Sequence, residues 1–257
     1  MPDERWVMAY EYDGSVWRVT ATRRIGVGEE IVAGREGELP LGVHVPDVLV
    51  SRRAMTVTAT EDGWTIRATN RNGAVLHPWC LPSHLIRKCS TTVDWPLVGV
   101  RLLPGSRTSQ HWLLLEFDDP STLVRVGEDE DPPEVGQHRG PVTATAFTPR
   151  GLTRAEREAL EAVFPRQLQW PPHEHTEPVL LKQAASRLRL SISGLQDRLK
   201  SALARALALG LDRPVALTDP AYLHVLARAG YLEPPLTFDH RSSHDPPWFG
   251  CPRTQPA

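Results

Sequence analysis

The stretch from residue 29 to residue 79, EEIVAGREGELPLGVHVPDVLVSRRAMTVTATEDGWTIRATNRNGAVLHPW, decides the fold of the first half of this 257-residue chain. In residues 55–60 small apolar residues alternate with threonine, and residues 64–67 repeat the alternation with larger side chains. A period of two with β-branched residues is typical of half-buried antiparallel strands. Glu61-Asp62-Gly63, between these runs, has the composition of a hairpin turn. We therefore expect an antiparallel β-sandwich.

Three short segments rich in hydrogen-bond donors interrupt these strands, at residues 34–35, 51–53 and 70–73. If the strands run away from one edge and back to it, all three segments lie as loops at one end of the sandwich. They contain arginines, a serine and two asparagines, and no nucleophile paired with a base. Arginine forms charge-assisted bonds with phosphate, serine adds a directional donor, and asparagine can bond a peptide backbone. The loops thus predict a surface that recognises phosphate, without catalytic residues.

The chain resembles the forkhead-associated (FHA) domain in three motifs, which are Gly34-Arg35, Ser51-Arg52-Arg53 and Asn72-Gly73. The resemblance covers roughly residues 15–118 and implies a β-sandwich that reads phosphothreonine in partner proteins. By this resemblance, the residues that bind the phosphopeptide are Arg35, Ser51, Arg52, Arg71 and Asn72. Arg35 and Ser51 would hold the phosphate, Arg52 or Arg71 would support it, and Asn72 would bond the peptide backbone. Asn70 is expected to shape the loop instead.

Two positions depart from the family pattern. The family's histidine, which braces the binding loops, is Ala54 here, and the threonine that usually follows asparagine-glycine is Ala74. Both changes remove side-chain hydrogen bonds that would preorganise the loops, and the ordering of loose loops costs affinity. The alternative is therefore a sandwich that has lost phosphate recognition and serves structure or dimerisation.

Length and composition predict a globular protein with more than one domain. Charged residues make up 23% and hydrophobic residues 40% of the chain, which excludes a disordered protein. The sandwich is expected over residues 1–118 and a helical domain over residues 151–235. Between them, residues 119–150 are acidic and rich in proline, which predicts a linker, and residues 236–257 lack periodicity, which predicts a flexible tail.

From residue 151 onward the apolar period changes from two to 3.6, which indicates helices. Thr153 and Glu156 have the spacing of a capping box and predict a first helix that ends before Pro165. A second helix is expected over residues 179–188.

A third helix is expected from residue 191 or 193 to residue 209, with Ser193 and Gln196 as its N-terminal cap. Two helices joined by so short a turn resemble a bacterial helix-turn-helix of the winged or sigma-region-4 kind. In that family a glycine usually stands in the turn, where this chain has Arg189. The predicted fold class is therefore multidomain, an FHA-like β-sandwich followed by an all-α helix-turn-helix domain.

Polar residues in the first half of the third helix are the candidates for contact with the DNA major groove, and they are Ser191, Ser193, Gln196, Arg198 and Lys200. Residues 182–205 contain six lysines and arginines and one acid, Asp197, a charge balance that favours phosphate contacts. The alternative is a helical domain that docks onto protein, which would make the chain a phosphopeptide-binding adaptor.

The combined pattern predicts a transcriptional regulator that binds a phosphothreonine-containing protein and double-stranded DNA. A link to a Ser/Thr protein kinase follows from the phosphothreonine, and a homodimer is possible.

Other classes of chemistry find little support. The histidines at 173, 175, 240 and 244 lack further ligands at a recognised spacing, so neither a metal nor a cofactor is expected. The three cysteines show no metal or redox spacing, and no nucleophile–base pair is evident, so we do not expect an enzyme. The longest apolar-rich run, residues 202–211, is too short to span a membrane, and no signal segment is evident. We expect a cytoplasmic protein without membrane contact.

Overall fold

The computed structural model describes residues 5–103, 110–117, 151–172 and 177–233. The predicted linker, the predicted tail and the histidines at 173, 175, 240 and 244 lie outside these residues. The described residues form two compact units. The first contains all the strands together with residues 170–172, and the second contains the helices.

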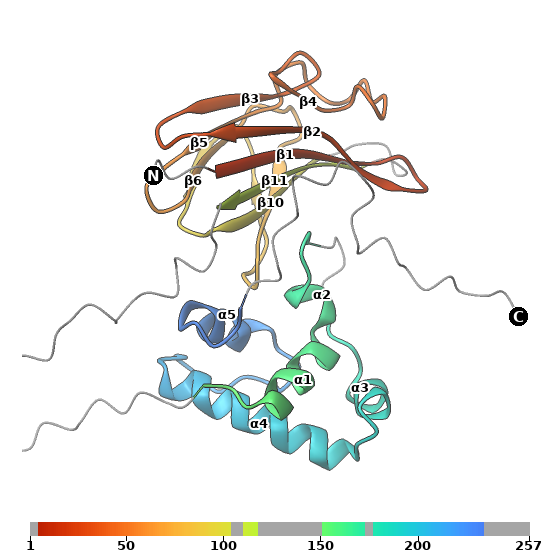
Figure 1. Ribbon diagram of the computed structural model, residues 1–257, viewed down its shortest axis with the longest axis vertical. Helices are drawn as coiled ribbons and strands as arrows, with labels where there is room; N and C mark the ends of the chain where they lie inside the picture. Colours follow the sequence, from red (N-terminus) through yellow and green to blue (C-terminus); the bar gives the residue numbers. More distant parts are fainter. Residues whose placement is uncertain (1–4, 104–109, 118–150, 173–176, 234–257) are drawn as a thin grey trace, which may run out of the picture. The chain divides into compact units, whose positions relative to one another are not determined.

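The first unit is a β-sandwich of two sheets (Figure 1). One sheet has the order β2-β1-β11-β10-β7-β8 and the other β4-β3-β5-β6-β9. The strands are β1 (Arg5–Tyr12), β2 (Trp17–Ile25), β3 (Glu30–Gly34), β4 (Leu39–Pro40), β5 (Met55–Ala59), β6 (Trp64–Ala68), β7 (Ala74–Pro78), β8 (His84–Ile86), β9 (Ser90–Val93), β10 (Leu97–Leu102) and β11 (Gln110–Phe117). The short β3–β4 pair is parallel and the other pairs are antiparallel. The expected antiparallel sandwich is confirmed, with this one parallel pair added.

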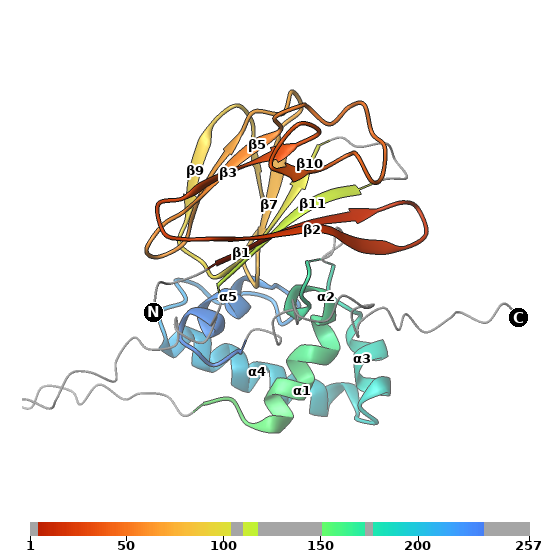
Figure 2. The ribbon, with the colours of Figure 1, turned by 45° about the horizontal axis from the view of Figure 1, so that its top comes forward.

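The two sheets face each other (Figure 2), and alternating side chains of their strands fill the interior between them. In β5 and β6 every second residue is buried, as the period of two predicts, and Thr60 N donates to Gly63 O at 3.0 Å to close the hairpin between them. Trp64 is fully buried, and its ring lies 5.8 Å from that of Phe117 in the opposite sheet. The guanidinium of Arg5 stacks 3.8 Å from the Phe117 ring and donates to Gly63 O at 3.0 Å, so this buried charge is well bonded.

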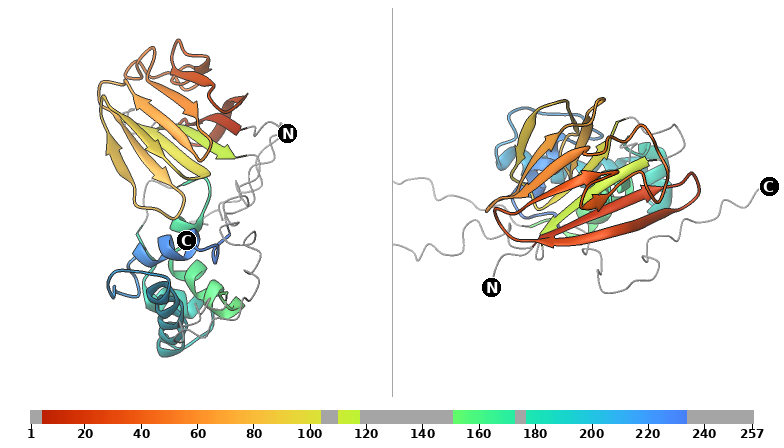
Figure 3. Two further views of the ribbon diagram at one scale, coloured as in Figure 1. Left: turned by 90° about the vertical axis from the view of Figure 1, so that its left-hand side faces the viewer. Right: turned by 90° about the horizontal axis from the view of Figure 1, so that it is seen from above.

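The helical unit packs around its longest helix. The helices are α1 (Arg154–Val163), α2 (Pro165–Leu168), α3 (Leu181–Arg187), α4 (Ile192–Ala208) and α5 (Ala221–Arg228). Helices α1, α3 and α5 each contact α4 (Figure 3), and α4 buries Leu195, Leu199, Ala202 and Ala206. Among the helices in the described ranges, none is long and apolar enough to cross a membrane.

Helix starts show where local sequence signals succeed and where they fail. The capping box of Thr153 and Glu156 at α1 is confirmed. The expected cap of α4 is wrong, because Ser191 rather than Ser193 accepts the bond from Gly194 N, at 3.0 Å. Helix α3 is shorter than expected and starts at Leu181 without a side-chain cap.

Candidate functional site

The strand registers bring the three donor-rich loops to one end of the sandwich. Strand β3 ends at Gly34 where β5 begins, and Met55 at the start of β5 pairs with Ala68 at the end of β6. Ala74, which begins β7, pairs with Leu102 at the end of β10. The loop after β3, the loop before β5 and the turn between β6 and β7 therefore emerge together.

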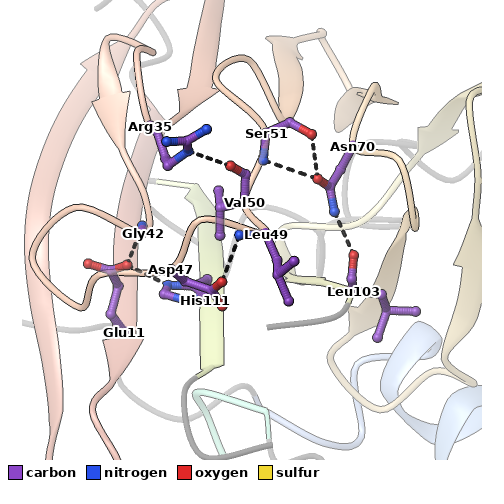
Figure 4. Close-up of polar contacts among 10 residues, drawn as sticks. All are labelled: Glu11, Arg35, Gly42, Asp47, Leu49, Val50, Ser51, Asn70, Leu103 and His111. Carbon is purple, nitrogen blue, oxygen red and sulfur yellow. Dashed lines mark hydrogen bonds and ion pairs between the residues drawn. The ribbon is translucent and has the colours of Figure 1, made fainter. Parts of the chain in front are cut away.

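Asn70 ties two of these loops to each other (Figure 4). Its side chain is 1% exposed, and its Oδ1 accepts from Ser51 Oγ at 2.7 Å and from Ser51 N at 3.2 Å. Its Nδ2 donates to Leu103 O at 2.6 Å. Because both ends of the carboxamide are used, Asn70 fixes Ser51 against the β6–β7 turn, and the expectation that it shapes the loop is confirmed.

Gly34 and Arg35 join the third loop to the same place. A Cβ on Gly34 would lie 2.5 Å from Arg52 O, and the φ of 149° also favours glycine, so only glycine lets the two loops approach this closely. The backbone of Arg35 donates to Ser51 O at 3.2 Å. Its Nε donates to Val50 O at 2.7 Å, which aims the half-buried guanidinium across the loop end (Figure 4).

The other residues predicted to bind the phosphopeptide are exposed or half-buried on these loops. Arg52 is exposed, and its Nε lies 3.4 Å from Glu36 Oε1. Arg71 is exposed and Asn72 half-buried in the β6–β7 turn, which Gly73 N closes by donating to Asn70 O at 3.0 Å. The structure thus gathers Arg35, Ser51 and Asn70 in one bonded network, with Arg71 and Asn72 in the adjoining turn.

Ala54 is fully buried and joins loops through its backbone. Its carbonyl accepts from Thr69 N at 3.0 Å and from Asn70 N at 2.7 Å, and its N–H donates to Ala33 O at 2.7 Å. These main-chain bonds, together with the Asn70 carboxamide, hold the loops to one another.

A buried polar cluster that the sequence did not reveal lies beneath the loop of residues 41–50. His111 of β11 lies 2.5 Å from Glu11 Oε1 through Nδ1 and 3.3 Å from Asp47 Oδ2 through Nε2. Glu11 and His111 are polar residues at inward positions of otherwise apolar strands, and that is the signal in the sequence that could have identified them.

The helical unit carries the other predicted site. Ser191 and Ser193 are exposed at the start of α4, Gln196 and Arg198 are half-buried, and Lys200 is exposed with Nζ 3.1 Å from Asp197 Oδ1. The turn between α3 and α4 places Arg189 at a φ of 54°, the left-handed conformation that glycine adopts most easily. The described part of this unit contains no strand, so the wing of a winged helix-turn-helix is not seen there.

One expected contributor of positive charge to that site is engaged elsewhere. Arg205, one of the six basic residues of the segment, is largely buried, and its Nη2 lies 3.2 Å from Glu156 Oε1. Ser201 Oγ also donates to this carboxylate. Arg205 therefore links α4 to α1 instead of facing a ligand.

Among the residues in the described ranges, no group of three or more histidine, cysteine, aspartate or glutamate side chains is placed to hold a metal ion.

No protein-family model matches this sequence, and no curated protein matches it. Solved structures similar to the first unit include an engineered FHA domain with a Myc-pTBD peptide, at 11% identity and a TM-score of 0.34, which covers 46% of this chain and 93% of that chain. The FHA domain of the CT664 protein from Chlamydia trachomatis is 14% identical with a TM-score of 0.31, and the match covers 44% of this chain and 96% of that chain. FHA-1 of Rv1747 from Mycobacterium tuberculosis is 19% identical with a TM-score of 0.28, over 46% of this chain and 98% of that chain.

Proposed function

We propose that the loop end of the β-sandwich binds a phosphothreonine-containing segment of a partner protein. The observation that carries the proposal is the bonded network in which Asn70 holds Ser51 by both its N–H and its hydroxyl, next to Arg35. The residues of three separate motifs, 34–35, 51–52 and 70–73, meet in that network. Such convergence of directed donors without a nucleophile–base pair suits recognition of an anion.

The network can accept a phosphate without leaving a buried group unsatisfied. Ser51 has one hydroxyl proton, which is donated to Asn70 in the absence of ligand. When that proton turns toward a phosphate oxygen, Asn70 Oδ1 still accepts the N–H of Ser51. Phosphate binding therefore avoids most of the free-energy penalty of leaving a buried acceptor without a hydrogen bond.

Arg35 supplies the charge. Its Nε–H is engaged by Val50 O, and the Nη groups at the far side of the guanidinium can donate to phosphate oxygens as a charge-assisted pair. Arg71 and Asn72, in the turn that Asn70 anchors, are the residues we assign to the remaining phosphate charge and to the peptide backbone. Arg52 joins them once its exposed pair with Glu36 opens, which costs little in water.

The test is fluorescence anisotropy of the whole protein with a degenerate phosphothreonine peptide pool, beside unphosphorylated and phosphoserine pools. We expect saturable binding of the phosphothreonine pool alone, lost in Arg35→Ala. Arg23→Ala is the matched control, because Arg23 is an exposed arginine in β2 paired with Val7, at the opposite end of the strands. Equal binding of all three pools, or equal loss in both variants, would refute phosphothreonine recognition.

We further propose that the helical unit binds double-stranded DNA, so that a kinase-marked partner is brought to DNA through this chain. The observation that favours it is the short turn at Arg189, in the left-handed conformation, between α3 and the polar start of α4. The exposed side chains of Ser191, Ser193 and Lys200, with the half-buried Gln196 and Arg198, are the proposed contacts.

Salt-dependent binding of duplex DNA by the whole protein, weakened in Arg198→Ala, would support this second function. Arg228→Ala is the control, since Arg228 is an exposed arginine in the last turn of α5. Absence of DNA binding at low salt, with phosphopeptide binding retained, would instead identify an adaptor whose helical unit docks onto protein. Absence of both, with a dimer in solution, would support the sandwich as a dimerisation module.

A further inference from the structure

We propose that the outer face of the five-stranded sheet holds a second anion site, which binds a further phosphorylated residue of the segment whose phosphothreonine lies at Arg35 and Ser51. The inference rests on the proposed function of the loop end. It goes further by naming the partner as a segment that carries two phosphorylated residues.

The outer face of this sheet, the layer that contains β3, β5 and β9, is polar and hollowed (Figure 2). In β5 and β6 every second residue is buried between the sheets, so the alternate side chains lie on the outer face. They line an open hollow of about 630 Å³. Its lining includes two arginines and four threonines, which are Arg53, Arg67, Thr56, Thr58, Thr65 and Thr69.

Two arginines give this hollow a positive charge. Arg53 and Arg67 are exposed, and among the residues that the structure describes their guanidinium groups have no hydrogen bond, ion pair or ring contact. Glu30 also lines the hollow, but it pairs with Thr58, so it lies two strands from Arg67 and one row further from the loop end. Both guanidinium groups are therefore available for charge-assisted bonds to an anion.

Hydroxyl groups beside Arg67 supply directional donors. Thr56 of β5 and Ser90 of β9 pair with Arg67 from its two sides, about 5 Å away in each direction. Within the described ranges the hydroxyls of Thr56 and Ser90 have no hydrogen-bond partner. In the next row, by contrast, Thr65 Oγ1 and Thr92 Oγ1 lie 3.3 Å apart and bond each other. The available donors are thus concentrated in the row of Arg67.

Arg53 connects the hollow to the first phosphate site. It follows Ser51 by two residues in the same loop, and its carbonyl accepts from Thr69 Oγ1 at 2.6 Å. Chain of this length spans at most about 7 Å, and the five residues from Ser51 to Thr56, beside Arg67, span at most about 17 Å. An extended peptide covers these distances in about two to five residues. We therefore expect the second phosphorylated residue about two to five positions from the phosphothreonine.

The number and charge of the donors favour a phosphorylated residue over an acidic one. A phosphorylated serine or threonine carries a charge of about −1.5 to −2 and three acceptor oxygens, whereas a carboxylate carries a single charge and two oxygens. Two guanidinium groups with hydroxyls between them match the first set more fully. Acidic residues 128–131 of this chain are the alternative occupant.

The first experiment compares peptide pools by fluorescence anisotropy with the whole protein. One pool carries phosphothreonine alone, and the others add a second phosphorylated residue, or glutamate, two to five positions away. The doubly phosphorylated pools should bind about fivefold to tenfold more tightly than the singly phosphorylated pool, because bonds between charged groups are added. The glutamate pools should gain less, and added salt should reduce both gains.

Arg67→Gln should remove this gain and leave the affinity for the singly phosphorylated pool unchanged, since Arg67 lies on a strand outside the loop end. Arg53→Gln should also remove it. Arg23→Gln is the matched control, because Arg23 is an exposed arginine in the other sheet, and it should keep the full gain. An unchanged tryptophan fluorescence spectrum checks the fold of each variant. Equal affinity of wild type for the singly and doubly phosphorylated pools would refute the second site alone.

Nitrogen-15 NMR of the arginine Nε groups, with phenyl phosphate as the probe, tests the second site separately. The Nε signals of Arg53 and Arg67 should shift saturably, in wild type and in Arg35→Ala alike, while that of Arg23 should not. Absence of these shifts, or equal shifts at all three, would overturn the proposal. If the shifts occur but no phosphothreonine pool binds, the proposed function fails, and the assignment of a doubly phosphorylated partner fails with it.

Replacing residues 128–131 by serine tests the alternative occupant. Without added phosphate, the Nε signals of Arg53 and Arg67 should be the same in this variant as in wild type. A change in both signals, together with tighter binding of phenyl phosphate, would identify the chain's own acidic residues as the occupant and overturn the assignment to a partner.

Discussion

Replacing Glu116 by glutamine tests how much burial in β11 disfavours the ionised form of this carboxyl group. Glu116 is fully buried, and its Oε1 accepts from the indole Nε1 of Trp170 at 2.6 Å. Burial raises the pKa of this carboxyl from 4.5 to about 7, although the bond from Trp170 lowers it in part. The folded protein thus holds the proton more tightly than the unfolded chain. Glu116 contributes full stability below about pH 4.5, and this contribution is lost as the pH rises through about 7.

The shift corresponds to about 3 kcal/mol of unfolding free energy between acidic and alkaline conditions. Glutamine keeps a carbonyl oxygen for Trp170 and carries no charge. Its added NH₂ group can cost roughly 1–2 kcal/mol if it is poorly bonded, but that cost does not change with pH. We therefore expect the stability of Glu116→Gln relative to wild type to rise with pH and to level off above about pH 8, by about 3 kcal/mol in total.

Urea unfolding followed by tryptophan fluorescence measures this difference, since seven of the eight tryptophans belong to the described residues of the first unit and none lies in residues 151–169 or 177–233, so the signal reports mainly on the sandwich. Glu61→Gln, at an exposed turn position, is the control and should show no such rise. A constant difference between Glu116→Gln and wild type from acidic to alkaline pH would refute the reasoning. Trp170→Phe should enlarge the effect, because it removes the bond that favours the carboxylate.

Two further predictions concern the helical unit. Arg189→Gly should raise its stability by about 1 kcal/mol, because glycine adopts the φ of 54° without strain; thermal unfolding followed by circular dichroism would measure this, and a lower midpoint would contradict it. Burial raises the pKa of Glu156, but hydrogen bonds from Ser201, Thr153 and Arg205 together lower it below its usual value. The ionised Glu156 therefore stabilises the folded protein at pH values above the pKa of the unfolded chain, and this stabilisation is lost as the pH falls through the pKa of the folded protein. Glu156→Gln should therefore be less stable than wild type at neutral pH and nearly equal to it in acid, and a gap that persists in acid would count against the ion pair.

Structural features that depend on a few neighbouring residues could be predicted from the sequence. The alternation in residues 55–60 and 64–67 predicted β5 and β6, because a strand exposes opposite faces at successive residues whatever it pairs with. The capping box of Thr153 and Glu156 predicted the start of α1, because its bonds close within four residues. The motifs at Gly34, Ser51 and Asn72 indicated a loop end, although their spacing says nothing about which groups bond each other.

Where two local signals competed, the sequence could not choose between them. Ser191 and Ser193 both offered a cap for α4, and the choice of Ser191 follows from where the left-handed Arg189 ends the turn after α3. Ala184 and Ala185 of α3 are buried, and the turn closes with a bond from Leu190 N to Ala185 O at 2.9 Å, which no cap motif encodes.

Contacts between distant segments were decided by the tertiary structure alone. His111 meets Glu11 across 100 residues of chain, and Trp170 meets Glu116 across 54. The first pair depends on β1 and β11 being neighbours, and a shift of one residue in their register would send one of its side chains to the opposite face, whereas the second depends on where the segment after α2 meets β11. The sequence by itself thus determined the local periods, caps and loop chemistry of this protein, whereas the β1–β11 pairing decided that the buried side chains of Glu11 and His111 meet, because register is a property of two segments together and not of either one.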